Sequence, residues 1–482
     1  MKLKSIYTAA AQKQKRAAKV LCALIFLLAC TLVFNFNIKN ADAQGTEAEL
    51  LTLTLTAASG NNCGNLLDDK YTSTVSFSGG DELTVSGNAP MQGIYIKWAA
   101  LGADFRVSYN GKTEEYKGEE FLHHYIDFGE TAESCTVYFE SGASVCDVFA
   151  YGKGELPSGV QRWESPCENA DILVFSTHAD DEILFLGGVL ATYAGQQGLD
   201  VQVAYMTNYW NGAKVREHEK LDGLWESGVR NYPVNGDFDD IYAETLDGAM
   251  SVYSYDDVLG YVTEQIRRFK PLVCVTQDLN GEYGHGGHML LAKAVCAAVG
   301  GSADAAFEPQ SADKYGAWDV PKTYLHLYGE NKITMNLREP LDKMNGRTAV
   351  EVASDAYLQH VSQQWCWFYV SDDYEYSCAD FGLYRTTVGK DTGSDMLENI
   401  TTYEEQESIA ESSRAAEEES QRQAEEASNS QGKDGSDTQG QSQAQKKSAV
   451  IPVVIVVLMI VLLLTAFFAY SRHTGNRRRR KR

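Results

Sequence analysis

Hydrophobic and polar residues alternate along the first third of the chain. The alternation is clearest in five short runs, at residues 51–56, 72–77, 93–98, 105–109 and 135–139. Gly, Asn, Ser and Asp separate these runs, as is usual where turns join strands. Because successive side chains of a strand point to opposite faces of a sheet, the pattern predicts an all-β sandwich domain over residues 44–160.

The pattern changes near Asp171, where residues 172–175 form an uninterrupted apolar run. Such a run is typical of a parallel strand that is buried on both faces. Further strands are predicted at residues 201–206, 272–276 and 323–328, and helices at residues 182–198, 213–228 and 288–299. Strands that alternate with helices predict an α/β domain with a mostly parallel sheet, which we place at residues 165–402.

Both ends of the chain carry an apolar segment. Residues 20–34 follow several lysines and precede a small-x-small cleavage pattern at residues 41–43, which predicts a secretory signal over residues 1–43. An uncleaved signal anchor is the alternative. Residues 449–470 predict a transmembrane helix, and the basic residues 471–482 predict a cytoplasmic tail. The chain is thus expected to be a single-pass protein of the cell membrane, with its N-terminal ectodomain outside.

Composition adds further constraints. The chain has 66 acidic and 42 basic residues, a net charge of −24, and the basic residues crowd the two ends. The exported part is therefore more acidic still, which argues against nucleic-acid binding. Residues 403–447 are rich in Glu, Gln, Ser, Ala and Lys and predict a disordered or partly helical stalk. The cysteines are too sparse for a disulfide framework.

A cluster of acidic residues with one histidine follows the first strand of the predicted α/β domain. Directly after residues 172–175 the sequence reads His178-Ala179-Asp180-Asp181-Glu182. Ligands of open α/β sheets collect at the carboxyl ends of strands, and carboxylates there also meet the positive end of a helix. Taken alone, the cluster would better suit a helix cap with acidic residues in the first turn.

A second cluster follows the strand at residues 272–276. It spans residues 281–288 and contains His285 and His288, three positions apart. A flexible loop with incidental histidines is the alternative, but both clusters end parallel strands, so we expect them to meet in one cleft. Two imidazoles, a carboxylate and a water suit a catalytic Zn²⁺, and a second carboxylate and a second histidine remain for proton transfer in amide hydrolysis.

The two clusters, in this order, resemble the signatures of the PIG-L/LmbE family of N-acetylglucosaminyl deacetylases. Those signatures are a strand ending in His-Pro-Asp-Asp-Glu and a later His-x-x-His. The resemblance covers residues 171–300 and continues toward residue 400. Arg216 and Glu219 form a similar Arg-x-x-Glu, and Tyr283 stands two positions before a histidine, as in the sugar-deacetylating members. The resemblance implies a Rossmann-like fold.

The resemblance also implies roles for the two clusters. One zinc ion per chain would be bound by His178, Asp181 and His288. Asp180 would be the general base. His285 would protonate the leaving amine or stabilise the oxyanion.

Two further residues receive roles in the same way. Tyr283 would contribute to the oxyanion site, and Arg216 would orient the substrate. The alternative for Arg216 is an exposed helical ion pair with Glu219, with His218 between them at the surface.

Two positions depart from the family pattern. Ala179 replaces the usual proline of the first signature. Gly287 replaces an acid that would help to orient a catalytic histidine, so some other carboxylate would have to take its place.

Several other segments have two interpretations. Residues 360–365 resemble a His-x-Ser-Gln stretch of the family and either line the cleft or form a core helix. The aromatic residues within 365–369 form either a sugar platform or an aromatic core strand, and the pattern favours the strand. The aspartates within 237–240 predict a solvated loop. The β-sandwich is similar to discoidin-like, galactose-binding domains and would be a glycan-binding module or a spacer.

The sequence thus predicts zinc-dependent hydrolysis of the N-acetyl group of an N-acetylglucosamine-type glycan or glycolipid at the cell surface. Two alternatives stay open. One is a surface glycan-binding or adhesion protein with a degenerate hydrolase domain, and the other is a different zinc-dependent amidase or esterase. The leading prediction has one geometric condition: the imidazoles of His178 and His288 must lie within about 6 Å of each other to share one ion.

Overall fold

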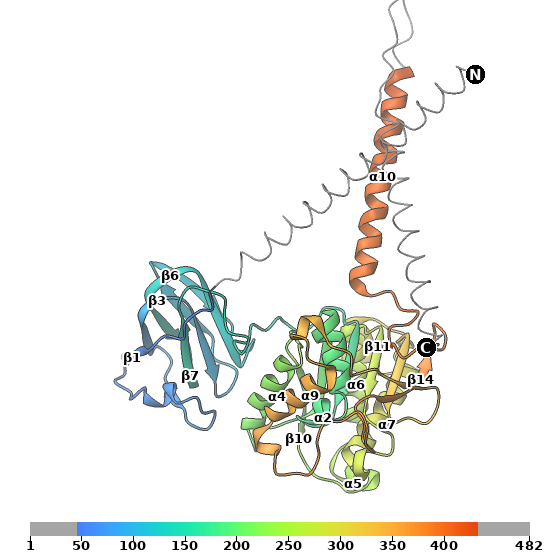
Figure 1. The fold of residues 1–482 in the computed structure, drawn as a ribbon, viewed down its shortest axis with the longest axis horizontal. Coiled ribbons are helices and arrows are strands. Elements are labelled where there is room, and N and C mark those ends of the chain that lie inside the picture. The colour runs from blue at the N-terminus through green and yellow to red at the C-terminus, as the bar shows by residue number, and fades with distance from the viewer. Residues whose placement is uncertain (1–45, 432–482) are drawn as a thin grey trace, which may run out of the picture. The chain divides into compact units, whose positions relative to one another are not determined.

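The computed structural model of the chain describes residues 46–431 (Figure 1). By its internal contacts the chain divides into two units, Met1–Ser408 and Ile409–Arg482. The predicted signal at residues 1–43, transmembrane helix at 449–470 and tail at 471–482 lie outside the described residues. Within residues 46–431, no helix is both long enough and apolar enough to cross a membrane.

The first part of the described chain forms an antiparallel sheet of seven strands, at the blue end of the colour scale in Figure 1. The strands are β1 (Leu53–Ala57), β2 (Val75–Phe77), β3 (Glu82–Trp98), β4 (Phe105–Tyr109), β5 (Lys112–Tyr116), β6 (His123–Phe139) and β7 (Ala143–Tyr151). The long strands β3 and β6 pair with irregular register between Ser86 and Gly93. Pro90 lies in this stretch and has no N–H for the ladder. The all-β prediction is confirmed.

A second seven-stranded sheet follows, with the strand order β10-β9-β8-β11-β12-β14-β13. Its strands are β8 (Ile172–Ser176), β9 (Val201–Asn208), β10 (Val234–Asp239), β11 (Val273–Thr276), β12 (Lys322–His326), β13 (Lys332–Thr334) and β14 (Asp380–Thr386). The pairs among β10, β9, β8, β11 and β12 are parallel, and β14 is antiparallel to both β12 and β13. The predicted mostly parallel α/β sheet is therefore confirmed.

Helices cover both faces of this sheet (Figure 1). They are α2 (Asp181–Leu184), α3 (Gly187–Val189), the π-helix η2 (Leu190–Gln197), α4 (Val215–Glu226), α5 (Leu246–Val252), α6 (Tyr255–Phe269), α7 (Gly286–Gly301), α8 (Pro309–Tyr315) and α9 (Ala349–Leu358). Short 3-10 turns are η1 (Gly64–Leu67), η3 (Glu282–Gly284), η4 (Asp342–Met344) and η5 (Val361–Gln363). Val174 shares a core with Leu221 of α4, whereas the next residue, Phe175, shares one with Val262 of α6. The continuous apolar runs of the strands thus supply two cores.

The helix predicted at residues 182–198 is broken into α2, α3 and η2. The break coincides with Gly187 and Gly188. A Cβ on Gly188 would lie 2.4 Å from Cδ1 of Leu337 and 2.7 Å from the carbonyl oxygen of Cys378. The glycines allow this close packing but weaken helix formation, so a single regular helix is not formed.

Helix α10 (Tyr403–Gln431) follows the α/β domain. Its start is fixed to that domain, because the backbone N of Tyr403 donates to Oδ1 of Asp171 at 2.9 Å and its hydroxyl donates to the Lys270 carbonyl at 2.6 Å. Residues 403–431 of the predicted stalk are therefore helical rather than disordered. Glu, Ala, Gln and Arg, which are strong helix formers, make up 20 of the 29 residues of this stretch.

Candidate active site

The first cluster lies in the loop that joins β8 to α2, and neighbouring strands hold this loop. The backbone N of Thr177 donates to Oε1 of Gln277, just after β11, at 2.9 Å. The Thr177 carbonyl accepts from the Thr207 hydroxyl of β9 at 2.8 Å. The loop carries His178 to the carboxyl edge of the sheet, where Asp180 has a φ of 133°. Such a φ is strained for a residue other than glycine and is typical of functional sites.

The second cluster lies between β11 and α7. The chain leaves β11, forms the turn η3 and enters α7, with His285 as the N-cap and His288 in the first turn. Gly281 has a φ of 67°, and a Cβ there would lie 2.4 Å from the His285 carbonyl oxygen, so this position requires glycine. Because β8 and β11 are adjacent parallel strands, both clusters reach the same edge of the sheet.

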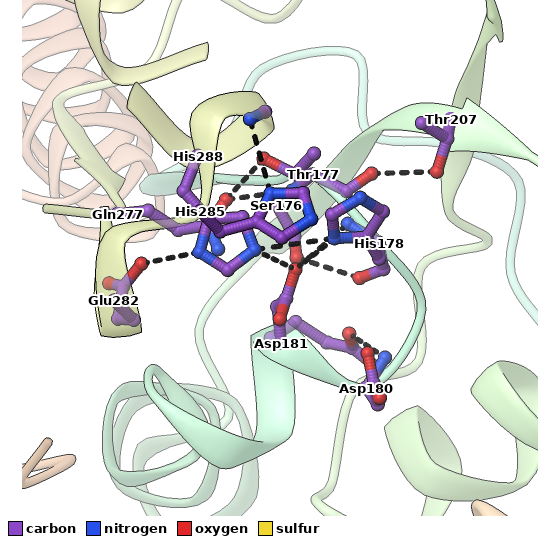
Figure 2. Close-up of polar contacts among 12 residues, drawn as sticks. Ser176, Thr177, His178, Asp180, Asp181, Thr207, Gln277, Glu282, His285 and His288 are labelled. Atoms are coloured by element: carbon purple, nitrogen blue, oxygen red, sulfur yellow. Dashed lines mark hydrogen bonds and ion pairs between the residues drawn. The ribbon is translucent and has the colours of Figure 1, made fainter. Parts of the chain in front are cut away.

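Three side-chain atoms from the two clusters form a close triangle (Figure 2). Nδ1 of His178 lies 2.8 Å from Oδ2 of Asp181, Nε2 of His288 lies 3.0 Å from the same oxygen, and the two nitrogens are 3.3 Å apart. Zinc ligands at about 2.0–2.1 Å in a tetrahedral arrangement are themselves about 3.3 Å apart. The condition that the two imidazoles could share one ion is met, and the donor set fits a single divalent cation.

His178, His285 and His288 form another possible ligand set, whose ligand atoms lie within 4.8 Å of one another. Asp181 is nevertheless the better third ligand, because its oxygen lies within 3.0 Å of both imidazole nitrogens of the triangle. Burial lowers the pKa of His288, but the carboxylates of Asp181 and Glu282 outweigh burial and raise it to about 10. The site therefore stabilises positive charge at the position that a metal ion would take.

Glu282 supports the triangle from behind and was not singled out from the sequence. Its Oε2 lies 2.7 Å from Nδ1 of His288, and its Oε1 lies 2.6 Å from Nδ1 of His326. Burial raises the pKa of Glu282, but hydrogen bonds to these two histidines outweigh burial and lower it to about 2. A carboxylate on the far nitrogen fixes the tautomer of a ligand histidine, so Glu282 turns Nε2 of His288 toward Asp181.

Asp180 lies beside the triangle, and Arg216 of α4 holds it. Nη2 of Arg216 lies 3.1 Å from Oδ1 of Asp180, and Nη1 lies 2.9 Å from Oδ2 of Asp240. Burial raises the pKa of Asp180 to about 7 against the opposing charge of Arg216, and Asp181 adds to the rise. A carboxyl with a pKa near neutrality is suited to both accepting and donating a proton.

The interpretation of Arg216 and Glu219 as an exposed ion pair is wrong. Both side chains are buried, and they bind different groups. Glu219 accepts hydrogen bonds from the backbone N and the hydroxyl of Ser362, at 2.7 and 2.6 Å. The helix α4 packs against α9 and the sheet, so its charged residues are covered and need fixed partners.

Asp240 is a second site residue that sequence reasoning missed. The prediction of a solvated loop at residues 237–240 is right in that its three aspartates are exposed, but it misses two features. Residues 234–239 form β10, and the carboxylate of Asp240, just after this strand, points into the site. Its Oδ1 lies 3.5 Å from Nε2 of His178. The only sequence signal was the position of Asp240 after a third strand, and β10 is an edge strand without a continuous apolar run.

His285 has a different environment from His288. Its Nδ1 accepts a hydrogen bond from the backbone N of Gly287 at 3.1 Å. Burial, with further contributions from His178 and His288, lowers the pKa of His285 to about 3. The N–H of Gly287 thus bonds to Nδ1 of His285. An acid at position 287 would instead orient the His285 ring through its carboxylate. Glu282 does not replace that acid, because it binds His288 instead.

A pocket of about 400 Å³ opens at this edge of the sheet. Six of the seven predicted site residues line it: His178, Asp180, Asp181, Arg216, Tyr283 and His285. The seventh, His288, is fully buried within the triangle. Tyr283 has a φ of 48°, and its ring packs on Phe368 with 4.5 Å between the centroids. The volume lies within the range of about 300–1,000 Å³ that is usual for small-molecule sites.

The aromatic segment after His360 lines the mouth of this pocket. The prediction of an aromatic core strand at residues 365–369 is wrong, since no strand covers these residues in the described chain and Trp365 is 82% exposed. Residues 360–365 do not form a core helix either: they contain the short turn η5, and Gln363 and Trp365 line the pocket.

His218 is buried rather than at the surface, so that prediction is wrong as well. Its Nδ1 lies 2.8 Å from Nε2 of His123 in β6, and its ring stacks on Tyr71 with 4.2 Å between the centroids. The Tyr71 hydroxyl donates to Oδ2 of Asp222, also on α4, at 2.6 Å. We call the part of the chain that forms β1–β7 the β-domain. Its contacts through His123 and Tyr71 hold α4, the helix that carries Arg216 to the site.

Replacing Tyr71 with Phe is expected to lower the free energy of unfolding by about 1–3 kcal/mol, because Asp222 loses a donor in a covered site. Urea denaturation of the full chain measures this change. The control is Tyr116→Phe, whose hydroxyl bonds to the exposed Glu114 at 2.7 Å, and it should change the free energy by less than about 0.5 kcal/mol. Equal effects of the two substitutions would show that the contact to Asp222 does not stabilise the fold.

Part of the α/β domain matches a model of a known protein family. Residues 173–299 match the family model described as "PIG-L: GlcNAc-PI de-N-acetylase". This stretch contains both clusters, so the resemblance noted from the sequence is confirmed there. The resemblance of the β-domain to discoidin-like domains stays a prediction.

Curated relatives match the same region. One relative is 1D-myo-inositol 2-acetamido-2-deoxy-alpha-D-glucopyranoside deacetylase 1 of Catenulispora acidiphila, which is 25% identical to this chain over 236 residues. The alignment covers 41% of this chain and 69% of that protein. A deacetylase of the same substrate from Rhodococcus erythropolis is 28% identical over 179 residues, which covers 32% of this chain and 59% of the relative. Among solved structures, N,N'-diacetylchitobiose deacetylase from Pyrococcus horikoshii is similar over 41% of this chain and 72% of its own, with 18% identity and a TM-score of 0.31.

Proposed function

We propose that this protein uses one Zn²⁺ per chain to hydrolyse the N-acetyl group of an N-acetylglucosamine-type glycan or glycoconjugate at the cell surface. The observation that carries the proposal is the triangle of His178, Asp181 and His288 beside Asp180, in a pocket of about 400 Å³. The names of the relatives, which are deacetylases of acetamido sugars, support the same reaction. The cell-surface location rests on residues 1–43 and 449–470, outside the described residues.

His178, Asp181 and His288 would hold the metal. Zinc bound there polarises a carbonyl and lowers the pKa of a water toward neutrality. The chain's own contribution is to orient the ligands. Glu282 accepts from Nδ1 of His288, which leaves the lone pair of Nε2 directed at the triangle.

Asp180 would carry the proton through the reaction. Its carboxylate would take a proton from the attacking water, and the resulting acid would give that proton to the departing amine. A pKa of about 7 allows both steps near neutral pH. Arg216 binds Oδ1 of Asp180 at 3.1 Å and so fixes the carboxylate while the proton moves.

His285 and Tyr283 would stabilise the charge that develops on the acetamide oxygen. Because Nδ1 of His285 accepts the Gly287 N–H, the neutral ring carries its proton on Nε2 and can donate that N–H. A doubly protonated ring would place two N–H groups against each other. We therefore assign protonation of the amine to Asp180 and oxyanion stabilisation to His285.

The alternatives make different demands on these residues. A glycan-binding protein with a degenerate hydrolase domain has no need for a buried carboxylate with a raised pKa next to three converging ligands. Another zinc-dependent amidase or esterase would use the same residues on a different acyl group. The choice of substrate separates that possibility from the proposal.

The test is acetate release by the full chain from neutral N-acetylglucosamine oligosaccharides. We expect release that stops when a chelator removes the metal and returns when Zn²⁺ is added back. Zinc should also stabilise the fold, by about 2.7 kcal/mol at a free concentration of 100 times Kd. A zinc-loaded sample that releases no acetate but hydrolyses other amides or esters would refute the proposed substrate. Glycan binding without any hydrolysis would favour the recognition role.

A further inference from the structure

Four exposed aromatic side chains belong to the two segments that contribute Trp365, Phe368 and Tyr242 to the pocket lining. Trp365, Trp367 and Tyr369 come from the segment after η5, and Tyr242 comes from the segment after β10. Their exposed fractions are 82, 61, 51 and 67%, respectively. We call these four residues the aromatic rim. Large aromatic side chains grouped on a surface usually mark a site of interaction.

The aromatic rim is continuous with the pocket. Trp365 and Tyr242 line the pocket together with Asp180 and His285. Tyr242 packs edge-on to His285, with 5.0 Å between the ring centroids. Two rings of the aromatic rim thus border the pocket directly, and Trp367 packs on Phe368, which also lines it.

Trp367 and Tyr369 of the aromatic rim are held in place by other rings. Trp367 packs on Phe368 with 4.1 Å between the centroids, and Phe368 packs on Tyr283 inside the pocket at 4.5 Å. Tyr369 stacks on Tyr374 at 4.6 Å. Rings supported in this way offer broad apolar faces at a low cost in side-chain entropy.

The size of the pocket limits what it can hold. A volume of about 400 Å³ is near the lower end of the range for small-molecule sites. It suits one acetamido sugar with part of a neighbour, so further sugars of a longer chain would lie outside, over the aromatic rim. The C–H faces of a sugar ring are apolar and flat enough to stack on Trp and Tyr, while its hydroxyls remain in water.

The charge next to the aromatic rim selects among glycans. Asp373 and Glu375 are exposed and flank Tyr374, the residue on which Tyr369 stacks. Arg338 pairs with Asp373 at 3.3 Å, whereas Glu375 has no ion-pair partner among the described residues. Phosphate-bearing or sulfated chains would be repelled, and neutral or amine-bearing chains would not.

We propose that the aromatic rim binds the sugar residues next to the acetamido sugar, so that the substrate is a neutral or amine-bearing oligosaccharide or polysaccharide chain rather than a single small sugar. This inference rests on the proposed deacetylase function and adds the substrate class. A lipid surface is the other material that exposed aromatic residues contact, and it is treated as an outcome of the test.

The experiment compares two neutral probes, N-acetylglucosamine and its β-linked tetramer, with the full zinc-loaded chain. We expect kcat/KM for the tetramer to exceed that for the monosaccharide by at least about tenfold, as one good stacking contact provides. Trp367→Ala should lower the tetramer-to-monosaccharide ratio by about tenfold, and Trp367→Phe should restore most of it. Tyr384→Ala, at a 38% exposed tyrosine that does not line the pocket, should leave the ratio as in wild type.

Binding to the Asp180→Asn variant separates this inference from the proposed function. Calorimetry should show that Asp180→Asn binds the tetramer, and that adding Trp367→Ala weakens this binding about tenfold. If wild type releases no acetate but this binding difference persists, the deacetylase function fails and the glycan site stands. Equal kcat/KM for both probes would overturn the inference. So would a Trp367→Ala effect on binding to neutral lipid vesicles but not on binding to the tetramer.

Discussion

Replacing Asp180 with Asn is expected to lower kcat for acetate release by at least about 10³-fold. General acid–base catalysis by one positioned group is worth about 10²–10⁴-fold, and Asp180 is assigned both proton transfers. Asn has the same shape and can still accept the hydrogen bond from Arg216, so the fold and the three metal ligands should be undisturbed. The measurements are the rate of acetate release and the zinc content of the purified variant, which should stay near one ion per chain.

The pH dependence of the wild-type protein provides a second test of Asp180. The carboxylate must be deprotonated to accept a proton from water, and its pKa is raised to about 7. Bound Zn²⁺ would add positive charge beside this carboxylate and lower its pKa, so activity, measured as kcat/KM, should rise with pH and level off at or below about pH 7. Asp237→Asn is the control, because Asp237 is exposed and does not line the pocket; its rate and pH profile should match wild type. An Asp180→Asn protein with more than a tenth of wild-type kcat would exclude Asp180 as the base.

The parallel strands and their ends could be predicted from the sequence because burial on both faces leaves a strong local pattern. Residues 172–175 form such a run, and the polar residues after it necessarily lie at the carboxyl edge of the sheet. The second strand run at residues 272–276 places His285 and His288 at the same edge. Two short sequence patterns were thus enough to anticipate five of the residues that line the pocket.

Contacts between residues far apart in the chain could not be predicted in this way. Asp240 reaches the site only because β10 pairs with β9 at the edge of the sheet. The sequence of β10 is as polar as that of a loop, so it does not reveal the strand. His218 is buried only because the β-domain packs against α4 through His123 and Tyr71, 95 and 147 positions away. Secondary-structure propensity and hydrophobic periodicity describe local structure. A polar residue that another domain covers is therefore still predicted to lie at the surface.

Local patterns also failed where packing overrides them. Strand β5 is at the edge of its sheet and exposed along residues 112–115, so it has no apolar face to reveal it. Trp365, Trp367 and Tyr369 have high strand propensity, yet they are exposed and belong to the aromatic rim. Apolar composition alone does not distinguish a core strand from a ligand platform, because both use large aromatic rings.

Replacing Glu282 with Ala is expected to lower zinc affinity by about 10–100-fold, which is the usual effect of removing a carboxylate that orients a ligand histidine. It should also lower the free energy of unfolding by about 3–5 kcal/mol, because two buried histidines, His288 and His326, lose their partner. Zinc affinity is measured by competition with a chromophoric chelator, and stability by urea denaturation. Glu330→Ala, at an exposed position outside the pocket, is the control and should change neither quantity.

The stability that Glu282 contributes should depend on pH in a defined direction. Its pKa is lowered in the folded protein from 4.5 to about 2. The contribution is therefore fully present above about pH 4.5 and is lost as the pH falls toward 2. Wild type should lose stability across that window more steeply than Glu282→Gln, which has no carboxyl to titrate and can accept a hydrogen bond from only one of the two histidines. Identical acid unfolding of the two proteins, or wild-type zinc affinity in Glu282→Ala, would mean that another group orients His288.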